Sequence, residues 1–436
     1  MIVQTKTGRL EGLTENGVTK FLGIPYAEAP VGDNRFKKTV SKKPWEGCIK
    51  ADTYAPKCPQ LAIPVAPDNG LPQSEDCLYL NVWTAMNEKQ NKPVLFWIYG
   101  GALSAGEGSS DIYEGSQFVK NGDVIVVTFN YRVGIFGGFF NLGSYPGMDR
   151  YTPNAGLYDV LEALKWVKEN IEYFGGDKNN ITICGESAGA SIAALLLCWP
   201  EAQGLYQKAI LESTFEYAIL PKENHVISDR ILSAANIENH SEFLELSTQE
   251  ILDALSDSCG GNILAAGAGF QQDMNFHGSV SAMLKERCAD VPVIIGFNHD
   301  EGFIFVDPKE EDFLQKVNMM TGILFESVIE AVIQADRTKD LFLYRFDYVP
   351  APLKSKGIGA LHSSEMPCVF HNLSCSTAAA MQGDMENAKT VSEAMHGSWI
   401  RFMTTGDAGW EAYSENKQEH MIFDVVSKTE NGSWKV

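Results

Sequence analysis

The sequence ITICGESAGASIAALLL, residues 181–197, decides the fold class. Ile181 to Cys184 is apolar and β-branched, which predicts a strand, and the small-residue stretch from Ala188 to Leu197 predicts a helix. Between them, Gly185-Glu186-Ser187-Ala188-Gly189 matches G-x-S-x-G, in which a serine occupies a sharp strand-to-helix turn. Small neighbours let strand and helix approach closely and lift the hydroxyl clear of the sheet. Ser187 is therefore predicted to be a nucleophile; the alternative is a serine that only caps the helix.

Strand and helix signals alternate on both sides of this stretch. Continuous apolar runs at 93–99 and 124–131 are typical of strands buried on both faces of a parallel sheet. Between them and the serine, 155–174 has apolar residues at helical spacing and ends at Gly175-Gly176. Further strands are predicted at 208–212, 292–296 and 341–348. This alternation predicts a doubly wound α/β fold with a central, mostly parallel twisted sheet flanked by helices.

The chain is predicted to be a single domain over 1–436, because no linker rich in Pro, Gly or Ser divides it. The stretch from about 215 to 290 has a mostly helical and polar pattern. We expect it to be an insertion over the edge of the sheet that forms a cap or pocket wall.

Composition limits the classes of partner. With 35 basic and 56 acidic side chains the formal net charge is −21, which disfavours nucleic acid and anionic membranes. Met1 to Gly12 lacks the features of a signal peptide, and the longest apolar runs are too short to span a bilayer, so a cytoplasmic location is expected. The nine cysteines form no CxxC pair, and no metal site is predicted.

An earlier strand ends in Tyr99-Gly100-Gly101-Ala102. Glycine-rich backbone at this place can turn sharply and present two N–H groups to one point, where they bind a developing oxyanion. Taken alone, the stretch is an ordinary glycine turn after a strand. Taken with the turn at Ser187 downstream, it predicts an oxyanion hole, to which the N–H of Ala188 also contributes.

A serine nucleophile needs a histidine that takes its proton and a carboxylate that orients that histidine. In this fold class the acid precedes the histidine along the chain. Asp300 and Glu301 follow the predicted strand 292–296, and either carboxylate fits. His362 follows the last clear strand by a loop. The other candidates downstream are His371, His396, which lies in a helical pattern, and His420, which lies in a polar tail.

These motifs resemble the type-B carboxylesterase/cholinesterase family, and in particular its bacterial carboxylesterases. The resemblance covers most of the chain and is weakest at about 215–290 and 305–340. The segments that carry it are Phe21-Leu22-Gly23-Ile24-Pro25-Tyr26-Ala27, Ser74-Glu75-Asp76-Cys77-Leu78-Tyr79-Leu80-Asn81, Asn130-Tyr131-Arg132, Phe174-Gly175-Gly176-Asp177, Gly185-Glu186-Ser187-Ala188-Gly189 and Arg401-Phe402.

The resemblance implies an α/β-hydrolase fold and more specific roles. It selects Glu301 over Asp300 as the acid and His362 as the base. It implies that the oxyanion donors are Gly101, Ala102 and Ala188. It also implies a structural pair between Glu75 and Arg132, near the chemistry but outside it, and it requires no metal or organic cofactor.

Two features depart from the family pattern. The family's His-Gly-Gly-Gly is Tyr-Gly-Gly-Ala here, so the methyl group of Ala102 narrows the expected hole. The interval from Glu301 to His362 is short, at 362 − 301 = 61 residues, as though cap helices were lost and the gorge were more open. Secreted members carry a disulfide at positions matching Cys58 and Cys77; without a visible signal peptide, the resemblance leaves it open here.

The expected activity is a two-step hydrolysis of small or aromatic acyl esters through an acyl-enzyme. Trp97, Phe136, Phe139 and Phe140 either line the pocket or belong to the core. Two other functions also fit these residues. One is an amidase, a lipase or an esterase acting on phenolic esters of plant cell walls; the other is a catalytically silent, cholinesterase-like binding module. The sequence leaves the oligomeric state open.

Overall fold

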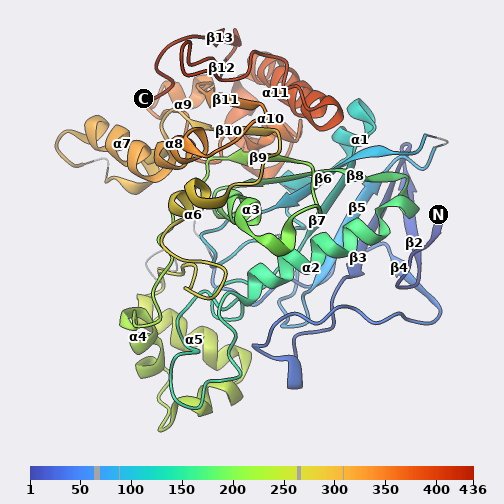
Figure 1. Ribbon diagram of the computed structural model, residues 1–436, viewed down its shortest axis with the longest axis vertical. Helices are drawn as coiled ribbons and strands as arrows, with labels where there is room; N and C mark the ends of the chain where they lie inside the picture. The colour runs from blue at the N-terminus through green and yellow to red at the C-terminus, as the bar shows by residue number, and fades with distance from the viewer. Residues whose placement is uncertain (63–68, 88, 263–266, 308) are drawn as a thin grey trace.

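The computed structural model describes residues 1–62, 69–87, 89–262, 267–307 and 309–436. Its centre is one 13-stranded sheet with the order β1-β2-β3-β5-β7-β6-β8-β9-β10-β11-β12-β13, in which β4 pairs with β2 (Figure 1). The parallel part comprises β7 (Ile125–Phe129), β6 (Lys92–Ile98), β8 (Gly176–Glu186), β9 (Lys208–Glu212), β10 (Val293–Asn298), β11 (Leu341–Phe346) and β12 (His420–Phe423).

Each of the six predicted strands corresponds to one of these parallel strands, within five residues at either end. The edges of the sheet were not predicted. They are antiparallel: β1 (Ile2–Gln4), β2 (Arg9–Glu15), β3 (Val18–Pro25) and β5 (Tyr79–Thr84) on one side, and β13 (Lys428–Glu430) on the other. The short β4 (Cys48–Ala51) lies beside β2. His420 was expected in a polar tail, but it is buried in β12, which the sequence pattern did not indicate.

The central strands are apolar on both faces because each face packs against helices. Along β6, Phe96 and Ile98 belong to one core cluster, and Leu95 and Trp97 belong to the other. The first cluster includes apolar residues of α2 (Ala155–Asn170) and α3 (Ala188–Cys198). The second includes residues of α1 (Ser116–Gly122) and α11 (Met385–Thr405). Figure 1 shows α2 lying across the strands, while α1 and α11 contact each other and pack against the other face of the sheet.

The predicted helix at 155–174 is α2 followed by the short η3 (Ile171–Phe174). It ends at Gly175, whose φ of 88° is left-handed, as helix-terminating glycines commonly are. The next strand, β8, already begins at Gly176, five residues before the predicted start at Ile181.

The segment between β9 and β10 contains α4 (Val226–Ala234), η5 (His240–Glu245), α5 (Thr248–Cys259) and α6 (Val280–Arg287). It is therefore helical, as expected, but its helices do different things. In Figure 1, α4 and α5 lie together below the strands, whereas α6 packs against α3 and α8. Only the α4–α5 pair projects as an insertion. Its role as a cap and the single-domain organisation stay predictions.

The remaining described helices lie in the connections between strands. They are α7 (Phe313–Thr321), the π-helical η8 (Gly322–Glu326), α8 (Ser327–Gln334), α9 (Ala351–Lys354) and α10 (Met366–Val369), with the short η1 (Gly32–Asn34), η2 (Asp111–Tyr113), η4 (Pro200–Ala202), η7 (Glu301–Phe305) and η9 (Ser376–Gly383). The stretch Phe313–Gln334 is long and apolar enough to cross a membrane by length and composition, but 44% of the tested window is buried in the protein. Buried core helices pass the same test, so this is weak evidence for a membrane span.

Candidate active site

Ser187 lies on a sharp turn between β8 and α3. Its φ of 57° and ψ of −126° are strained for a residue with a side chain, which is typical of a nucleophile elbow. The flanking glycines allow the close approach: a Cβ on Gly189 would lie 2.0 Å from the carbonyl oxygen of Ile98, and one on Gly185 would lie 2.5 Å from the Gly189 backbone. The Ser187 side chain makes no capping hydrogen bond to α3, so this serine does not act as a helix cap.

Glu301 and His362 are brought together from two different strand ends. Glu301 begins η7 just after β10, and His362 lies in the loop that follows β11. The Nδ1 atom of His362 is 2.5 Å from Oε2 of Glu301, whose other oxygen accepts a hydrogen bond of 2.8 Å from the N–H of Asn298. Glu301 is fully buried, and 11% of the His362 side chain is exposed. The carboxylate therefore holds one ring nitrogen and fixes the orientation of the ring.

Asp300, the other candidate acid, has a different place. Its Oδ2 accepts a hydrogen bond of 2.8 Å from the N–H of Ala360, and its own N–H donates to the carbonyl of Ala360 at 3.0 Å. These bonds fasten the turn after β10 to the loop that carries His362. Asp300 also lies 3.1 Å from Nδ1 of His299.

The second nitrogen of His362 faces Glu186 rather than the nucleophile. Its Nε2 atom is 3.2 Å from Oε1 of Glu186, which also accepts a hydrogen bond of 2.6 Å from the hydroxyl of Ser363. In the described part of the chain, Ser187 and His362 make no hydrogen bond with each other. The ring thus lies between two carboxylates, and Nε2 must leave Glu186 to reach the serine.

Charge and burial act against each other at this histidine. Burial lowers the pKa of His362, but the negative charges of Glu301 and Glu186 outweigh it and raise the pKa to about 10. Burial raises the pKa of Glu186, although the charge of His362 opposes that shift. Burial also raises the pKa of Glu365 well above its ordinary value and that of Glu212 to about 8. The pKa of His362 is therefore affected by three buried carboxyl groups, Glu301, Glu186 and Glu365, and not by the single one predicted.

The glycine turn after β6 approaches the nucleophile closely. A Cβ on Gly100 would lie 2.9 Å from the Cβ of Ser187. Gly101 and Ala102 have positive φ values of 115° and 53°. The N–H groups of Gly101, Ala102 and Ala188 donate to no acceptor among the described residues, so all three are free to bind a ligand oxygen.

Several residues of the site were not predicted. Glu186 is the variable residue next to the nucleophile, and only its burial beside His362 distinguishes it. Asn298 donates through its side chain to Glu365 at 2.5 Å and to the carbonyl of Leu361 at 2.6 Å. The only sequence signal for Glu365 was its place in the loop shortly after His362. No signal distinguished Asn298 or Glu212.

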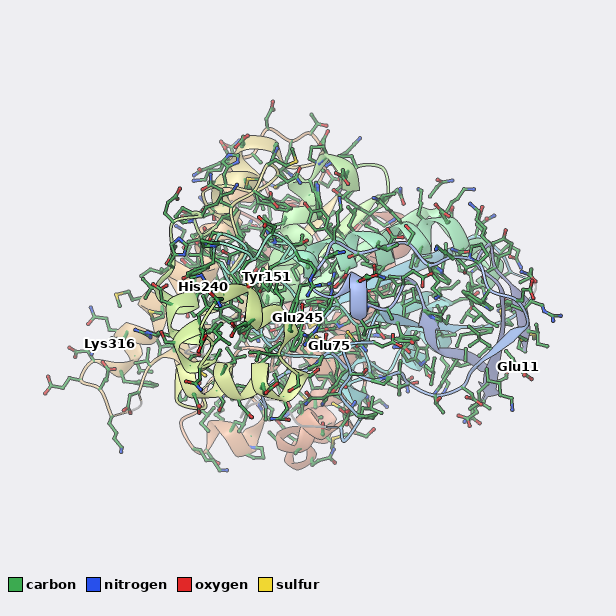
Figure 2. The ribbon with its side chains drawn as sticks, turned by 90° about the horizontal axis from the view of Figure 1, so that it is seen from below. Glu11, Glu75, Tyr151, His240, Glu245 and Lys316 are labelled. Carbon is green, nitrogen blue, oxygen red and sulfur yellow. The ribbon has the colours of Figure 1, made fainter. Side chains whose placement is uncertain are left out.

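The predicted pair between Glu75 and Arg132 is wrong. Arg132 instead binds buried Asp159 through two hydrogen bonds of 2.8 Å. Glu75 binds a different arginine, Arg35, through two hydrogen bonds of 2.7 Å. Arg35 also donates to the carbonyls of Leu244 and Leu246. Seen from below in Figure 2, Glu75 lies next to the segment that carries Glu245, so this ion pair attaches η5 and α5 to the body of the protein.

The four aromatic residues considered for the pocket belong to the core. Trp97, Phe136, Phe139 and Phe140 are at most 4% exposed. A different aromatic group lies beside the histidine: the Phe325 ring centroid is 5.4 Å from that of His362, and Phe325 contacts Phe215 and Phe305 at 5.7 and 6.3 Å. Phe305 is 42% exposed, so this group reaches the surface.

The other residues singled out in the sequence lie elsewhere. His371 and His396 stack on each other near α11, with ring centroids 5.2 Å apart. Cys58 and Cys77 are buried free thiols, and a hydrogen bond between them raises the pKa of Cys77. Among the described residues, no group of three or more His, Cys, Asp and Glu side chains is arranged to hold a metal ion.

Comparison with known proteins agrees with this geometry. The model of the carboxylesterase family matches residues 1–318. The chain is 35% identical to the para-nitrobenzyl esterase of Bacillus subtilis (strain 168), over 99% of this chain and 96% of that protein. It is 31% identical to the phenmedipham hydrolase of Pseudarthrobacter oxydans, over 93% of this chain and 90% of that protein. A solved PNB esterase structure superposes with a TM-score of 0.88 at 33% identity, covering 99% of this chain and 97% of the other.

The predicted α/β-hydrolase fold is confirmed by these structural neighbours, and the silent binding module is set aside because the relatives are hydrolases. The substrates of such a protein are small-molecule esters. The chain belongs to the carboxylesterase family and is a carboxylic-ester hydrolase.

Proposed function

We propose that the protein hydrolyses carboxylic esters through a covalent acyl-enzyme on Ser187, with His362 as the general base and Glu301 as the residue that orients it. The observation that carries the proposal is the 2.5 Å contact between His362 Nδ1 and Glu301, which leaves Nε2 as the nitrogen available for proton transfer. The strained turn at Ser187 supports the same assignment.

The reaction has two steps. His362 Nε2 takes the hydroxyl proton of Ser187 while the serine oxygen bonds to the ester carbonyl carbon. The carbonyl oxygen becomes an oxyanion, which the free N–H groups of Gly101, Ala102 and Ala188 stabilise. The intermediate collapses, the bond to the alcohol oxygen breaks, and His362 returns the proton to the alcohol. Water then repeats the sequence on the acyl-enzyme and releases the acid and free Ser187.

Before the first step, His362 must lose its proton and its Nε2 must leave Glu186 for Ser187. Catalytic hydrogen bonds are often long or misaligned without substrate and tighten when it binds. The contact with Glu186 therefore describes a resting arrangement, and a substrate that excludes water from the site favours the working one.

The aromatic group beside His362 supports a preference for aromatic or short acyl groups. The Phe325, Phe215 and Phe305 rings offer an apolar wall next to the reacting atoms. Flat aromatic groups pack well against such rings. The name of one relative, para-nitrobenzyl esterase, refers to an ester whose alcohol part is aromatic, which such rings could also contact.

The test is hydrolysis of p-nitrophenyl esters from acetate to palmitate, with Ser187→Ala measured beside the native protein. We expect turnover of the short chains and a loss in kcat of about 10⁴-fold or more in the variant. Equal rates for the two proteins would refute the assignment of Ser187. A preference for palmitate over acetate would contradict the proposed substrate class but not the mechanism.

A further inference from the structure

The loop that carries the proposed oxyanion donors is conformationally strained. Within it, Gly101, Ala102, Leu103 and Gly106 have positive φ values of 115°, 53°, 59° and 118°. For Ala102 and Leu103 this left-handed conformation is unfavourable, because the Cβ crowds the backbone. Strain of this kind persists only where the surroundings hold the backbone in place. The loop therefore needs contacts that hold it in this conformation.

One set of hydrogen bonds joins residues within the loop, and a further bond joins the loop to Gly134. The carbonyl of Gly101 accepts hydrogen bonds from the N–H groups of Ser104 and Ala105, at 3.0 and 3.1 Å. The carbonyl of Leu103 accepts one of 2.7 Å from the N–H of Gly134. Neither contact fixes the end of the loop, where the chain turns back at Gly106.

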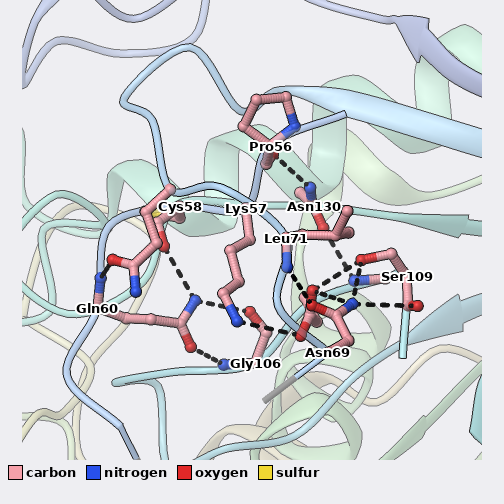
Figure 3. A network of polar contacts seen from close by, with 12 residues as sticks. Pro56, Lys57, Cys58, Gln60, Asn69, Leu71, Gly106, Ser109 and Asn130 are labelled. Carbon is pink, nitrogen blue, oxygen red and sulfur yellow. Dashed lines mark hydrogen bonds and ion pairs between the residues drawn. The ribbon is translucent and has the colours of Figure 1, made fainter. Parts of the chain in front are cut away.

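Gln60 fixes that end through both atoms of its side-chain amide (Figure 3). Its Oε1 accepts a hydrogen bond of 2.7 Å from the N–H of Gly106, and its Nε2 donates to the carbonyl of Gly106 at 3.0 Å. Nε2 also donates to the carbonyl of Cys58 at 2.9 Å, which orients the amide. The amide thus binds both the N–H and the carbonyl of Gly106, as a neighbouring strand in a sheet would.

Gly106 in turn lies against the start of the loop. A Cβ on Gly106 would be 2.6 Å from the carbonyl oxygen of Gly100, and one on Gly101 would be 2.2 Å from the carbonyl oxygen of Ala105. The two ends of the loop are therefore in backbone contact. A displacement of Gly106 is transmitted to Gly100 and Gly101, next to Ser187.

The segment after Gly106 is held separately. Glu107, which is buried, accepts hydrogen bonds from Asn69 at 2.8 Å and Ser109 at 2.7 Å, and lies 3.4 Å from Nζ of Lys57 (Figure 3). This network supports the chain beyond the loop. Its bonds between described residues end on the Glu107 side chain, whereas those of Gln60 end on the Gly106 backbone, so the role of Gln60 is distinct.

We infer that Gln60 is a positioning residue for the oxyanion hole: its amide holds Gly106, and through Gly106 it keeps the N–H groups of Gly101 and Ala102 aimed at the substrate oxygen. This inference rests on the proposed function. Gln60 touches no reacting atom, and it acts only by fixing the backbone of the loop.

The test compares Gln60→Ala with Gln207→Ala. Gln207 is a matched control, because its Oε1 also accepts a backbone hydrogen bond of 2.9 Å, from Ile181 in the middle of β8. We expect Gln60→Ala to lower kcat about tenfold or more with little change in KM, because the donors bind the oxyanion of the transition state much more strongly than the carbonyl of the bound substrate. Gln207→Ala should leave both constants near the native values.

A second readout separates positioning from a general loss of stability. The serine adds to the carbonyl of an aryl trifluoromethyl ketone and forms an oxyanion. The matching methyl ketone is less reactive and binds mainly without this addition, so it has no oxyanion. In Gln60→Ala, affinity for the trifluoromethyl ketone should fall by the same factor as kcat/KM, and affinity for the methyl ketone should hardly change. Equal losses for both ketones, or kcat unchanged, would overturn the inference.

If Gln60→Ala does not fold, Gln60→Glu replaces it, because Glu keeps the size and the acceptor for Gly106 but lacks the donor. A selective loss for the trifluoromethyl ketone in Gln60→Glu supports the inference, and native behaviour overturns it. Failure of the proposed function is seen differently: the native protein and Ser187→Ala would then hydrolyse esters at equal rates, whatever the variants of Gln60 do.

Discussion

Two buried histidines in this molecule have opposite electrostatic surroundings. His362, at the carboxyl ends of the strands, lies between Glu301 and Glu186, and its pKa is raised to about 10. His396, in α11 on one face of the sheet, is 3% exposed and binds the carbonyl of Val369 through Nδ1 at 2.8 Å. Burial lowers the pKa of His396 to about 4, although the Val369 carbonyl opposes the shift.

The difference shows that burial alone does not decide the protonation state of a histidine. Both rings lose water, which favours the neutral form in each case. At His362 two carboxylates reverse that preference. At His396 the neighbours are the Val369 carbonyl, the Asn121 amide and the rings of Phe118 and His371, and none of these carries a negative charge. Only the first arrangement can stabilise the imidazolium that forms during ester hydrolysis, and the second is suited to structural packing.

The largest effect should follow from removing the charge that orients His362. Glu301→Gln keeps the shape of the side chain but presents the wrong partner to Nδ1, and we expect kcat for a short-chain p-nitrophenyl ester to fall about 10³- to 10⁴-fold. The comparison is Asp300→Asn, which leaves the partner of His362 in place and loosens only the turn. A loss of less than tenfold is expected there. Equal losses in the two variants would mean that the loop and not the charge matters.

The strands and the serine turn could be predicted from the sequence because they depend on local patterns. The apolar runs of β6 and β7 and the G-x-S-x-G turn are properties of a few adjacent residues. Sequence order restricted the base to four histidines, and the residues alone could not separate them. What separates His362 from His396 is the presence of Glu186 and Glu301, which come from two other strand ends, and such contacts leave no local signal.

The antiparallel edges of the sheet and the partners of Glu75 and Arg132 were missed for the same reason. At one edge, β12 and β13 have too few residues to show a period. At the other edge, β2, β3 and β5 are long enough, but their antiparallel pairing is set by contacts between strands and not by a local pattern. Arg132 binds Asp159, which lies inside α2, and that choice depends on how α2 packs against the loop after β7. An assumed pairing of two charged motifs could not foresee a third charge brought in by packing.

The next largest effect concerns stability and pH. The pKa of His396 is about 4 in the folded protein and about 6.5 when unfolded. Between these values the unfolded chain binds more protons, so the free energy of unfolding falls as pH drops from about 6.5 to about 4. The full loss is about 3 kcal/mol, of which about 2 kcal/mol falls above pH 5.

His396→Gln removes this titration and keeps a side chain that can donate to Val369. Urea unfolding at pH 7.5 and pH 5 should therefore show a decrease that is about 2 kcal/mol smaller in the variant than in the native protein. An identical pH dependence in His396→Gln and the native protein would exclude His396 as the group that titrates.

The smallest effect should come from removing the second carboxylate beside His362. Glu186→Gln retains the size of the side chain and the acceptor for Ser363, but it eliminates a charge 3.2 Å from Nε2. The reaction needs neutral His362, so kcat/KM rises with pH through the pKa of this group, and that limb should move down by about one pH unit. Glu212→Gln makes the same change in a buried carboxyl group whose Oε1 accepts from Trp399 and Cys184 and which is not among the main charges acting on His362. The rise of kcat/KM with pH should hardly move in Glu212→Gln. A limb that stays in place in Glu186→Gln, or moves upward, would mean that Glu301 alone sets the pKa of His362, and the contrast with His396 would then rest on one carboxylate and not two.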